Sequence, residues 1–189
     1  EHAPCGSYAG SPRGRARPTP ALPLMTAGTV RAALESLALP LPESAIRDGL
    51  ANARLAGRMQ RLQSEPLVIV DVAHNPHSAA YLASQLRQIP GKGKRRAVVG
   101  MLKDKDMAGS LAELDGLIDA WFLASLTGPR AATAEQLAAA LGEGKGQALR
   151  FDDVSAAYQA VLSASSPDDM VIVFGSFYTV ADILAGTAS

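Results

Sequence analysis

The sequence predicts an α/β fold in which helices cover both faces of a mostly parallel sheet. Short apolar runs of strand length alternate with longer segments of helical periodicity through most of the chain. This alternation is typical of βαβ units, because a parallel strand is buried on both faces and carries few polar residues. The composition agrees, since 48% of the 189 residues are hydrophobic and 19% are charged, which allows a sizeable core.

The chain begins with a segment that has no periodicity. Residues 1 to 24 hold five of the twelve prolines, several glycines and serines, and Arg13, Arg15 and Arg17. We expect an irregular Pro/Gly-rich arm, since nothing in this composition supports a packed core. A basic arm that touches an acidic partner is the alternative.

A pair of short helices is expected over residues 25 to 56, before the strand–helix alternation starts. Thr26 is a candidate N-cap for the first helix, and an apolar stripe follows it. Pro40 and Pro42 interrupt this helix, and Glu43–Ala53 is expected to form the second. Since two short helices cannot bury a core of their own, they need a partner to pack on.

The alternation opens with the apolar run Leu67–Val70, and a buried strand is expected over Leu67–Val72. Asn75 and Pro76 follow as the N-cap and first residue of a helix, because an Asn side chain accepts a first-turn N–H and proline needs no donor there. Further strands are expected at Arg95–Met101, Ala120–Ser125, Leu149–Phe151 and Met170–Gly175, helices at Pro76–Gln88, Asp106–Leu117, Thr133–Leu141, Val154–Ser163 and Phe177–Leu184, and an additional edge strand at Met59–Gln63.

Polar residues follow several strands, at the edge where all parallel strands end. Asp71 lies at the end of the first strand and His74 follows it, while Lys105 follows the second strand and Ser176 the last. Helix N-termini at this edge add partial positive charge, which suits a nucleotide or a carboxylated substrate. Taken singly, these residues have plainer explanations: Asp71 can cap a helix, His74 and Lys105 can be solvated loop residues, and Arg58 can form a surface ion pair.

Several classes of function receive no support from the composition. Lys plus Arg and Asp plus Glu each number 18, so the basic surplus of a nucleic-acid-binding domain is missing. No apolar run approaches the ~20 residues that span a bilayer, so no membrane association is expected. Cys5 is the only cysteine, which excludes an internal disulfide and favours a reducing, cytoplasmic setting.

Two glycine-rich stretches imitate phosphate-binding loops without having their spacing. Gly91–Lys94 and Gly142–Gly146 do not match the pattern G-x-x-x-x-G-K-[ST], in which successive N–H groups cradle a phosphate. We interpret both stretches as ordinary turns. The chain also lacks G-x-G-x-x-G after a strand, so a dinucleotide site has no local support.

Four motifs in fixed order resemble the dihydrofolate synthase/folylpolyglutamate synthase family of the Mur ligase superfamily. The resemblance covers residues 26 to 189 and includes the stretch Gly128–Leu137. The motifs are Gly57-Arg58-Met59-Gln60, Asp71-Val72-Ala73-His74-Asn75-Pro76-His77, Gly100-Met101-Leu102-Lys103-Asp104-Lys105-Asp106 and Phe174-Gly175-Ser176-Phe177-Tyr178-Thr179-Val180.

The resemblance implies an ATP-dependent ligase. In this family ATP phosphorylates a substrate carboxylate, and the amine of L-glutamate then displaces phosphate to form an amide. The acceptors are dihydropteroate and a reduced folate, and the full-length enzyme is expected to be a cytoplasmic monomer.

The family also implies a domain arrangement. Residues 57–189 would form its Rossmann-like C-terminal domain, and residues 25–56 would be the remnant of the preceding ATPase domain. A start at Glu1 predicts a fragment, inactive by itself, whose P-loop and Mg²⁺ ligands lie upstream in cis, so no metal ligand is expected here.

The resemblance assigns roles to individual residues. Arg58 would reach the ATP phosphates, for which a permanently charged, bidentate guanidinium is suited. Asp71 would accept hydrogen bonds from the nucleotide ribose, and His74 would lie near the transferred phosphoryl group and the incoming glutamate as the catalytic candidate. Lys105 and Ser176 are candidates for binding the glutamate carboxylates.

One position departs from the family. Thr26 stands where the family usually has an Asn whose amide helps to hold ATP, and a threonine hydroxyl can cap a helix but offers no such amide. Two alternatives to a folate ligase remain open. One is the C-terminal domain of a peptidoglycan Mur ligase, and the other is a non-catalytic domain that binds a nucleotide or a partner.

Overall fold

The computed structural model describes residues 24–37, 41–53 and 55–187. It divides the chain into two compact units, Glu1–Ala53 and Arg54–Ser189, which we describe separately. The arm expected over residues 1 to 24 lies outside the described residues, apart from Leu24. Within the described residues, no helix is long and apolar enough to cross a membrane.

The first unit contains the expected pair of short helices, α1 (Leu24–Ser36) and α2 (Glu43–Asn52). An exposed ion pair joins them, with 3.0 Å between Arg31 Nη1 and Glu43 Oε1. The N-cap predicted at Thr26 is wrong, because Thr26 already lies inside α1. Its side chain lies outside the part that the structure describes.

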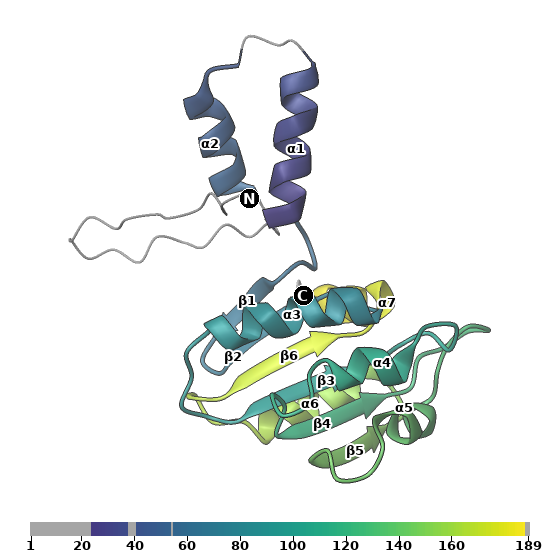
Figure 1. The fold of residues 1–189 in the computed structure, drawn as a ribbon. Helices are drawn as coiled ribbons and strands as arrows, with labels where there is room; N and C mark the ends of the chain where they lie inside the picture. Colours follow the sequence, from purple (N-terminus) through teal and green to yellow (C-terminus); the bar gives the residue numbers. More distant parts are fainter. Residues whose placement is uncertain (1–23, 38–40, 54, 188–189) are drawn as a thin grey trace. The chain divides into compact units, whose positions relative to one another are not determined.

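The second unit is built on a six-stranded sheet with the strand order β1-β2-β6-β3-β4-β5 (Figure 1). Only the edge strand β1 runs antiparallel to its neighbour, and the other adjacent pairs are parallel. The mostly parallel sheet predicted from the sequence is therefore confirmed. The strands are β1 (Gln60–Ser64), β2 (Leu67–Asp71), β3 (Arg95–Val99), β4 (Ala120–Ala124), β5 (Gln147–Phe151) and β6 (Met170–Phe174).

Helices cover both faces of this sheet, as expected. One face carries α3, α4 and α5, and the other carries α6 and α7 (Figure 1). The two apolar layers follow the alternation of side chains along each strand, since Ile172 packs on the first face and Val171 and Val173 on the second. The helices are α3 (Pro76–Gln88), α4 (Met107–Ala112), α5 (Ala134–Leu141), α6 (Val154–Ser163) and α7 (Phe177–Thr187).

The strand order creates a point where the chain changes direction. The chain moves outward from β2 through β3 and β4 to β5, and then returns to place β6 between β2 and β3. The helices that follow β2 and β6 therefore leave toward opposite faces of the sheet. In open α/β sheets a crevice forms at the carboxyl ends of such strands and is the usual place for a ligand.

Most elements differ from the prediction by one to three residues at an end, and the helix after β3 differs most. The helix expected over Asp106–Leu117 ends at Ala112, and the next residues form turns in which Leu114 and Leu117 donate to carbonyls three residues earlier. Gly116 adopts φ +69°, which a regular helix does not allow. Strand β5 starts at Gln147, before the expected Leu149, because it pairs with β4 along its whole length.

Candidate functional site

The candidate site lies at the carboxyl edge of the parallel strands, at the rim formed by the loops after β2, β3 and β6. The structure places Asp71 at the end of β2 and His74, Lys105 and Ser176 on these loops, as the sequence predicts. Arg58 joins the rim because its neighbour Met59 is hydrogen-bonded to Asp71. Thr26 belongs to the other unit.

The loop after β2 has the local structure expected from its sequence. Asn75 Oδ1 accepts the backbone N–H of Ser78 at 2.9 Å, Ser78 Oγ accepts that of Asn75, and Pro76 occupies the first turn of α3. This capping box satisfies first-turn donors that the helix itself cannot pair. The predicted cap and helix start are confirmed, and they hold the preceding residue, His74, in place.

Asp71 is buried at the end of β2, with 6% of its surface exposed. Its Oδ2 accepts the backbone N–H of Met59 at 2.9 Å, and its Oδ1 accepts that of Ala73 at 2.8 Å. Burial raises the pKa of this carboxyl, against the lowering effect of both hydrogen bonds and of the nearby Arg58 charge. Asp71 therefore ties the segment before β1 to the loop after β2.

The segment that carries Arg58 is held in an unusual backbone conformation. Gly57 has φ +67° and Met59 has φ +44°, although Met59 is not a glycine. A Cβ on Gly57 would come within 2.9 Å of Val72 Cγ1, so only glycine fits the close approach to β2. The Gly57 carbonyl accepts the N–H of Val72, and the Gly57 N–H donates to Gln60 Oε1, both at 2.8 Å.

Arg58 itself is partly buried, and its guanidinium makes no hydrogen bond or ion pair with another described residue. The charge of Asp71 is close enough to interact with it. A partly buried guanidinium with free donors is suited to an anion that offers several oxygens, such as a phosphate chain.

His74 presents one ring nitrogen to the rim. Its Nδ1 lies 2.8 Å from the carbonyl oxygen of Val72. Because a carbonyl oxygen only accepts hydrogen bonds, Nδ1 must carry the hydrogen, and a neutral ring then has its lone pair on Nε2. The ring of Phe177 lies beside it, with 6.2 Å between the centroids and a tilt of 48°.

Lys105 and Ser176 occupy different environments. Lys105 Nζ lies 3.5 Å from Asp104 Oδ2, and Arg130 Nη2 donates to the same oxygen at 2.7 Å. Ser176 is 3% exposed, and its hydroxyl accepts the backbone N–H of Thr179 at 3.0 Å, which caps α7. A direct bond from the Ser176 hydroxyl to glutamate stays a prediction, and it would require this loop to open.

The rim also contains an ion pair and two exposed aromatic side chains to which the sequence assigned no role. The Asp104–Arg130 pair joins the loops after β3 and β4, and its hydrogen bond lowers the pKa of Asp104. Phe177 and Tyr178 at the start of α7 are 61% and 63% exposed. The pairing of two charges far apart in the sequence and the exposure of two aromatic side chains have no local sequence signal, so only the fold could reveal them.

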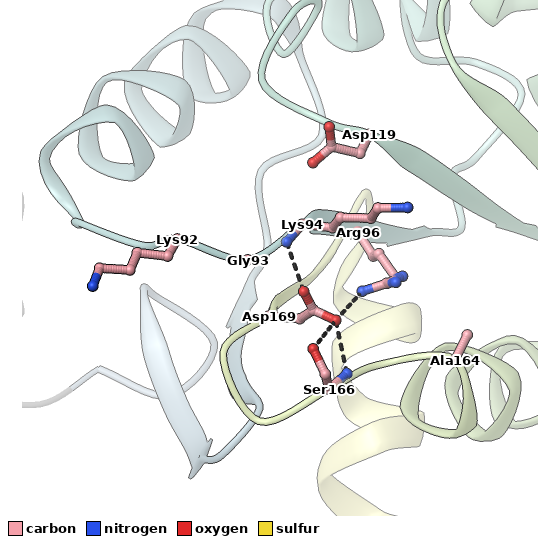
Figure 2. A pocket seen from close by; sticks show the side chains of 8 residues that line it. All are labelled: Lys92, Gly93, Lys94, Arg96, Asp119, Ala164, Ser166 and Asp169. Atoms are coloured by element: carbon pink, nitrogen blue, oxygen red, sulfur yellow. Dashed lines mark hydrogen bonds and ion pairs between the residues drawn. The ribbon is translucent and has the colours of Figure 1, made fainter.

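A shallow hollow of the second unit lies at the opposite edge, where the parallel strands begin. A hollow of about 490 Å³ is lined there by Lys92, Gly93, Lys94, Arg96, Asp119, Ala164, Ser166 and Asp169. Figure 2 shows the Asp169 carboxylate bonded to the Lys94 N–H, the Arg96 guanidinium and both donors of Ser166. Since its carboxylate is already saturated, we interpret this region as structural.

A metal site is not evident on either edge. Among the described residues, no group of three or more His, Cys, Asp or Glu side chains could hold a metal ion.

Comparisons with known proteins identify the family of this chain. Residues 57–177 match the family model described as "Mur ligase, glutamate ligase domain". The dihydrofolate synthase/folylpolyglutamate synthase of Escherichia coli (strain K12) is 48% identical over 167 residues, which are 88% of this chain and 39% of that protein. The chain therefore spans about two fifths of the length of the relatives that it matches.

Two solved structures are similar in sequence and fold. E. coli FolC in complex with DHPP and ADP is 46% identical, with a TM-score of 0.84 over 90% of this chain and 40% of that chain. A bifunctional folylpolyglutamate synthase/dihydrofolate synthase with Mn, AMPPNP and L-glutamate bound is 45% identical, with a TM-score of 0.83 over 96% of this chain and 44% of that chain. The chain thus belongs to the Mur ligase family and contains its glutamate ligase domain, the C-terminal domain of dihydrofolate synthase/folylpolyglutamate synthases.

Proposed function

We propose that this chain is the C-terminal part of an ATP-dependent ligase that adds L-glutamate to dihydropteroate, to folylpolyglutamate, or to both. The names of its relatives and the molecules bound in their structures support this assignment. In the reaction, the terminal phosphoryl group of ATP passes to a substrate carboxylate. The glutamate nitrogen then attacks that carbon, the C–O bond to the phosphoryl group breaks, and phosphate leaves with the electron pair.

The observation that carries the proposal is the free guanidinium of Arg58 at the rim of a domain of this family. In the proposed role, Arg58 binds phosphate oxygens and stabilises the negative charge that moves to the leaving phosphate. Bound Mg²⁺ would neutralise phosphate charge, and we place its ligands outside the described residues. The nucleotide contact of Thr26 stays a prediction.

His74 is proposed to act on the glutamate amine. The ammonium form has no lone pair, so it must lose a proton before it can attack. The Nε2 lone pair, which the bond from Nδ1–H to the Val72 carbonyl leaves free, can accept that proton. Lys105 is proposed to bind a glutamate carboxylate. In the structure the Asp104 carboxylate lies beside the Lys105 ammonium group, where the glutamate carboxylate would bind.

The proposal is tested by comparing the 189-residue chain alone with the chain joined to the upstream sequence that its relatives have. Each protein is assayed for glutamate ligation to dihydropteroate, to a reduced folate and to a UDP-sugar peptide. We expect ligation to a folate-type acceptor by the joined protein only. The chain alone should neither ligate glutamate nor hydrolyse ATP, because Arg58 and His74 form only part of the proposed site.

The alternatives predict different results. Ligation to the UDP-sugar peptide alone would assign a peptidoglycan ligase, and nucleotide binding without ligation by the joined protein would assign a binding domain. Arg58→Ala should abolish ligation, whereas Arg61→Ala should not, because Arg61 is an exposed residue of the edge strand β1 and has no role in the proposed site.

A further inference from the structure

We propose that Thr179 is a positioning residue for glutamate binding, whose buried hydroxyl joins the loop that carries Lys105 to the loop that carries Ser176. We call the hydrogen-bonded set of Gly100, Ser176 and Thr179 the hydroxyl clamp. The inference rests on the proposed function for the role of Lys105, and Ser176 is the other candidate contact for glutamate. Thr179 touches no ligand in this role and acts through the two loops.

The hydrogen bonds of the hydroxyl clamp allow one arrangement of its hydrogens. Thr179 Oγ1 lies 2.7 Å from the Gly100 carbonyl oxygen, which can only accept, so the Thr179 hydroxyl donates there. Ser176 Oγ lies 2.8 Å from Thr179 Oγ1 and must donate to it, because the single hydroxyl hydrogen of Thr179 is already used. Ser176 Oγ in turn accepts the Thr179 N–H at 3.0 Å. Thr179 therefore orients the Ser176 hydroxyl and holds Gly100 at the same time.

Close packing makes the hydroxyl clamp a precise contact. Thr179 is 0% exposed and Ser176 is 3% exposed, so solvent does not compete for these bonds. A Cβ on Gly100 would lie 2.6 Å from Thr179 Oγ1, and a Cβ on Gly175 would clash with the Gly100 carbonyl oxygen. Glycine at both positions therefore lets the two loops approach closely enough for the Thr179 bond.

The loop after β3 is anchored at its start by this clamp. Gly100 is the first residue after β3, and its carbonyl is the acceptor for Thr179. Further along the loop, the Lys103 N–H donates to the Arg130 carbonyl at 2.8 Å. Lys105 is therefore carried by a short segment whose first residue is held by Thr179.

A separate bond holds the loop after β2. The Gly175 N–H donates to the Ala73 carbonyl at 2.9 Å, and the Thr179 hydroxyl takes no part in this bond. The loop begins beside Asp71, the candidate for binding the nucleotide ribose. Loss of the Thr179 hydroxyl should therefore disturb glutamate binding and leave ATP binding nearly unchanged.

The first test measures KM for glutamate and KM for ATP in the joined, full-length protein with a folate-type acceptor. Thr179→Val replaces the hydroxyl by a methyl group and should raise KM for glutamate about tenfold, the effect of losing one buried hydrogen bond. KM for ATP should change by less than about twofold, because the bond from Gly175 to Ala73 remains. Thr179→Ser keeps the hydroxyl and should hold KM for glutamate within about twofold of the parent value.

A second pair of variants keeps the test decisive if Thr179→Val does not fold. Thr179→Cys and Thr179→Ser have similar shapes, but a thiol is a weaker donor than a hydroxyl. KM for glutamate should therefore be higher for Thr179→Cys than for Thr179→Ser. Ile183→Val is the control for lost stability, because Ile183 is a buried, apolar residue of the same helix. It should lower the unfolding free energy without raising KM for glutamate.

Four results would overturn the inference. They are an unchanged KM for glutamate in Thr179→Val, equal increases in its two KM values, equal KM values for glutamate in Thr179→Cys and Thr179→Ser, and an increase for Ile183→Val as large as that for Thr179→Val. The last result would assign the effect to a general loosening of α7.

A separate measurement distinguishes failure of the clamp from failure of the proposed function. If the joined parent does not ligate glutamate, the proposed function fails, and the clamp is judged by amide hydrogen exchange in the 189-residue chain. The Lys105 N–H donates to the Leu102 carbonyl at 3.1 Å within the loop after β3. Thr179→Val should speed exchange of this N–H about tenfold, and an unchanged rate would refute the clamp.

Discussion

The substitution Asp169→Asn tests the interpretation that Asp169, at the edge where the parallel strands begin, has a structural role. Asp169 and Arg96 form an ion pair whose side chains are only 6% and 11% exposed (Figure 2). The Asp169 carboxylate also accepts the Lys94 N–H at 2.6 Å and the Ser166 N–H at 2.7 Å. An asparagine has the same size, but it removes the charge and turns its NH₂ group toward one of these donors.

The expected loss of unfolding free energy is large, because the Arg96 charge would stay buried without its partner. Breaking a buried pair in this way costs about 3–5 kcal/mol. With a urea m-value of about 2 kcal/mol/M, the unfolding midpoint of the second unit should fall by about 2 M. The assay is urea unfolding of the 189-residue chain, followed by circular dichroism and by Trp121 fluorescence.

Asp168→Asn is the matched control, because the neighbouring Asp168 is exposed. This substitution should change the unfolding free energy by no more than about 0.5 kcal/mol. A loss below about 1 kcal/mol for Asp169→Asn, or equal losses for the two variants, would refute the reasoning.

The same contacts predict how the stability contributed by Asp169 changes with pH. Burial raises the pKa of Asp169, but hydrogen bonds from Ser166, Arg96 and Lys94 outweigh burial and hold the pKa well below its usual value. A depressed pKa in the folded state contributes stability above the unfolded pKa of about 3.9, and that stability is lost as the pH falls toward the folded pKa. The difference in unfolding free energy between the parent and Asp169→Asn should therefore be constant down to about pH 4 and should shrink only below that pH.

Three further predictions concern the rim. Asn75→Ala should lower the unfolding free energy by ~1 kcal/mol in urea unfolding, because it removes the cap of α3, and an unchanged midpoint would contradict this role. Gly175→Ala should lower the unfolding free energy by about 3 kcal/mol or more, because Gly175 has φ +119° and an added Cβ would clash with the Gly100 carbonyl oxygen. An unchanged unfolding free energy would show that the two loops can move apart. In ¹⁵N NMR of the neutral ring, His74 should have the hydrogen on Nδ1, and a hydrogen on Nε2 would exclude the proposed proton acceptor.

The sequence predicted the elements of the second unit well because its strands are apolar on both faces. Runs such as Val68–Val70 and Val171–Val173 are fully buried between two helix layers, so composition alone marks them. The helix start at Asn75 was also readable, because capping is a local interaction between residues a few positions apart. These features need no knowledge of the rest of the chain.

Features that depend on distant residues escaped prediction. The insertion of β6 between β2 and β3 follows from pairing between remote segments, which no local pattern encodes. The early end of α4 was missed because Leu114 and Leu117 continue the apolar spacing although their backbone forms turns. At the candidate site, Arg58 and Asp71 were proposed from the sequence, but the backbone hydrogen bond from Met59 that connects their segments was not.

The interior place of β6 has a consequence for how the polypeptide matures on the ribosome. β6 pairs with both β2 and β3, yet it is the last of the sheet strands to leave the exit tunnel. Until it emerges, β2 and β3 each have an unpaired apolar edge, which is a template for aggregation. Chains halted before Met170 should therefore be strong chaperone clients, and closure of the sheet should be a late, slow step that depends on contacts of high sequence separation.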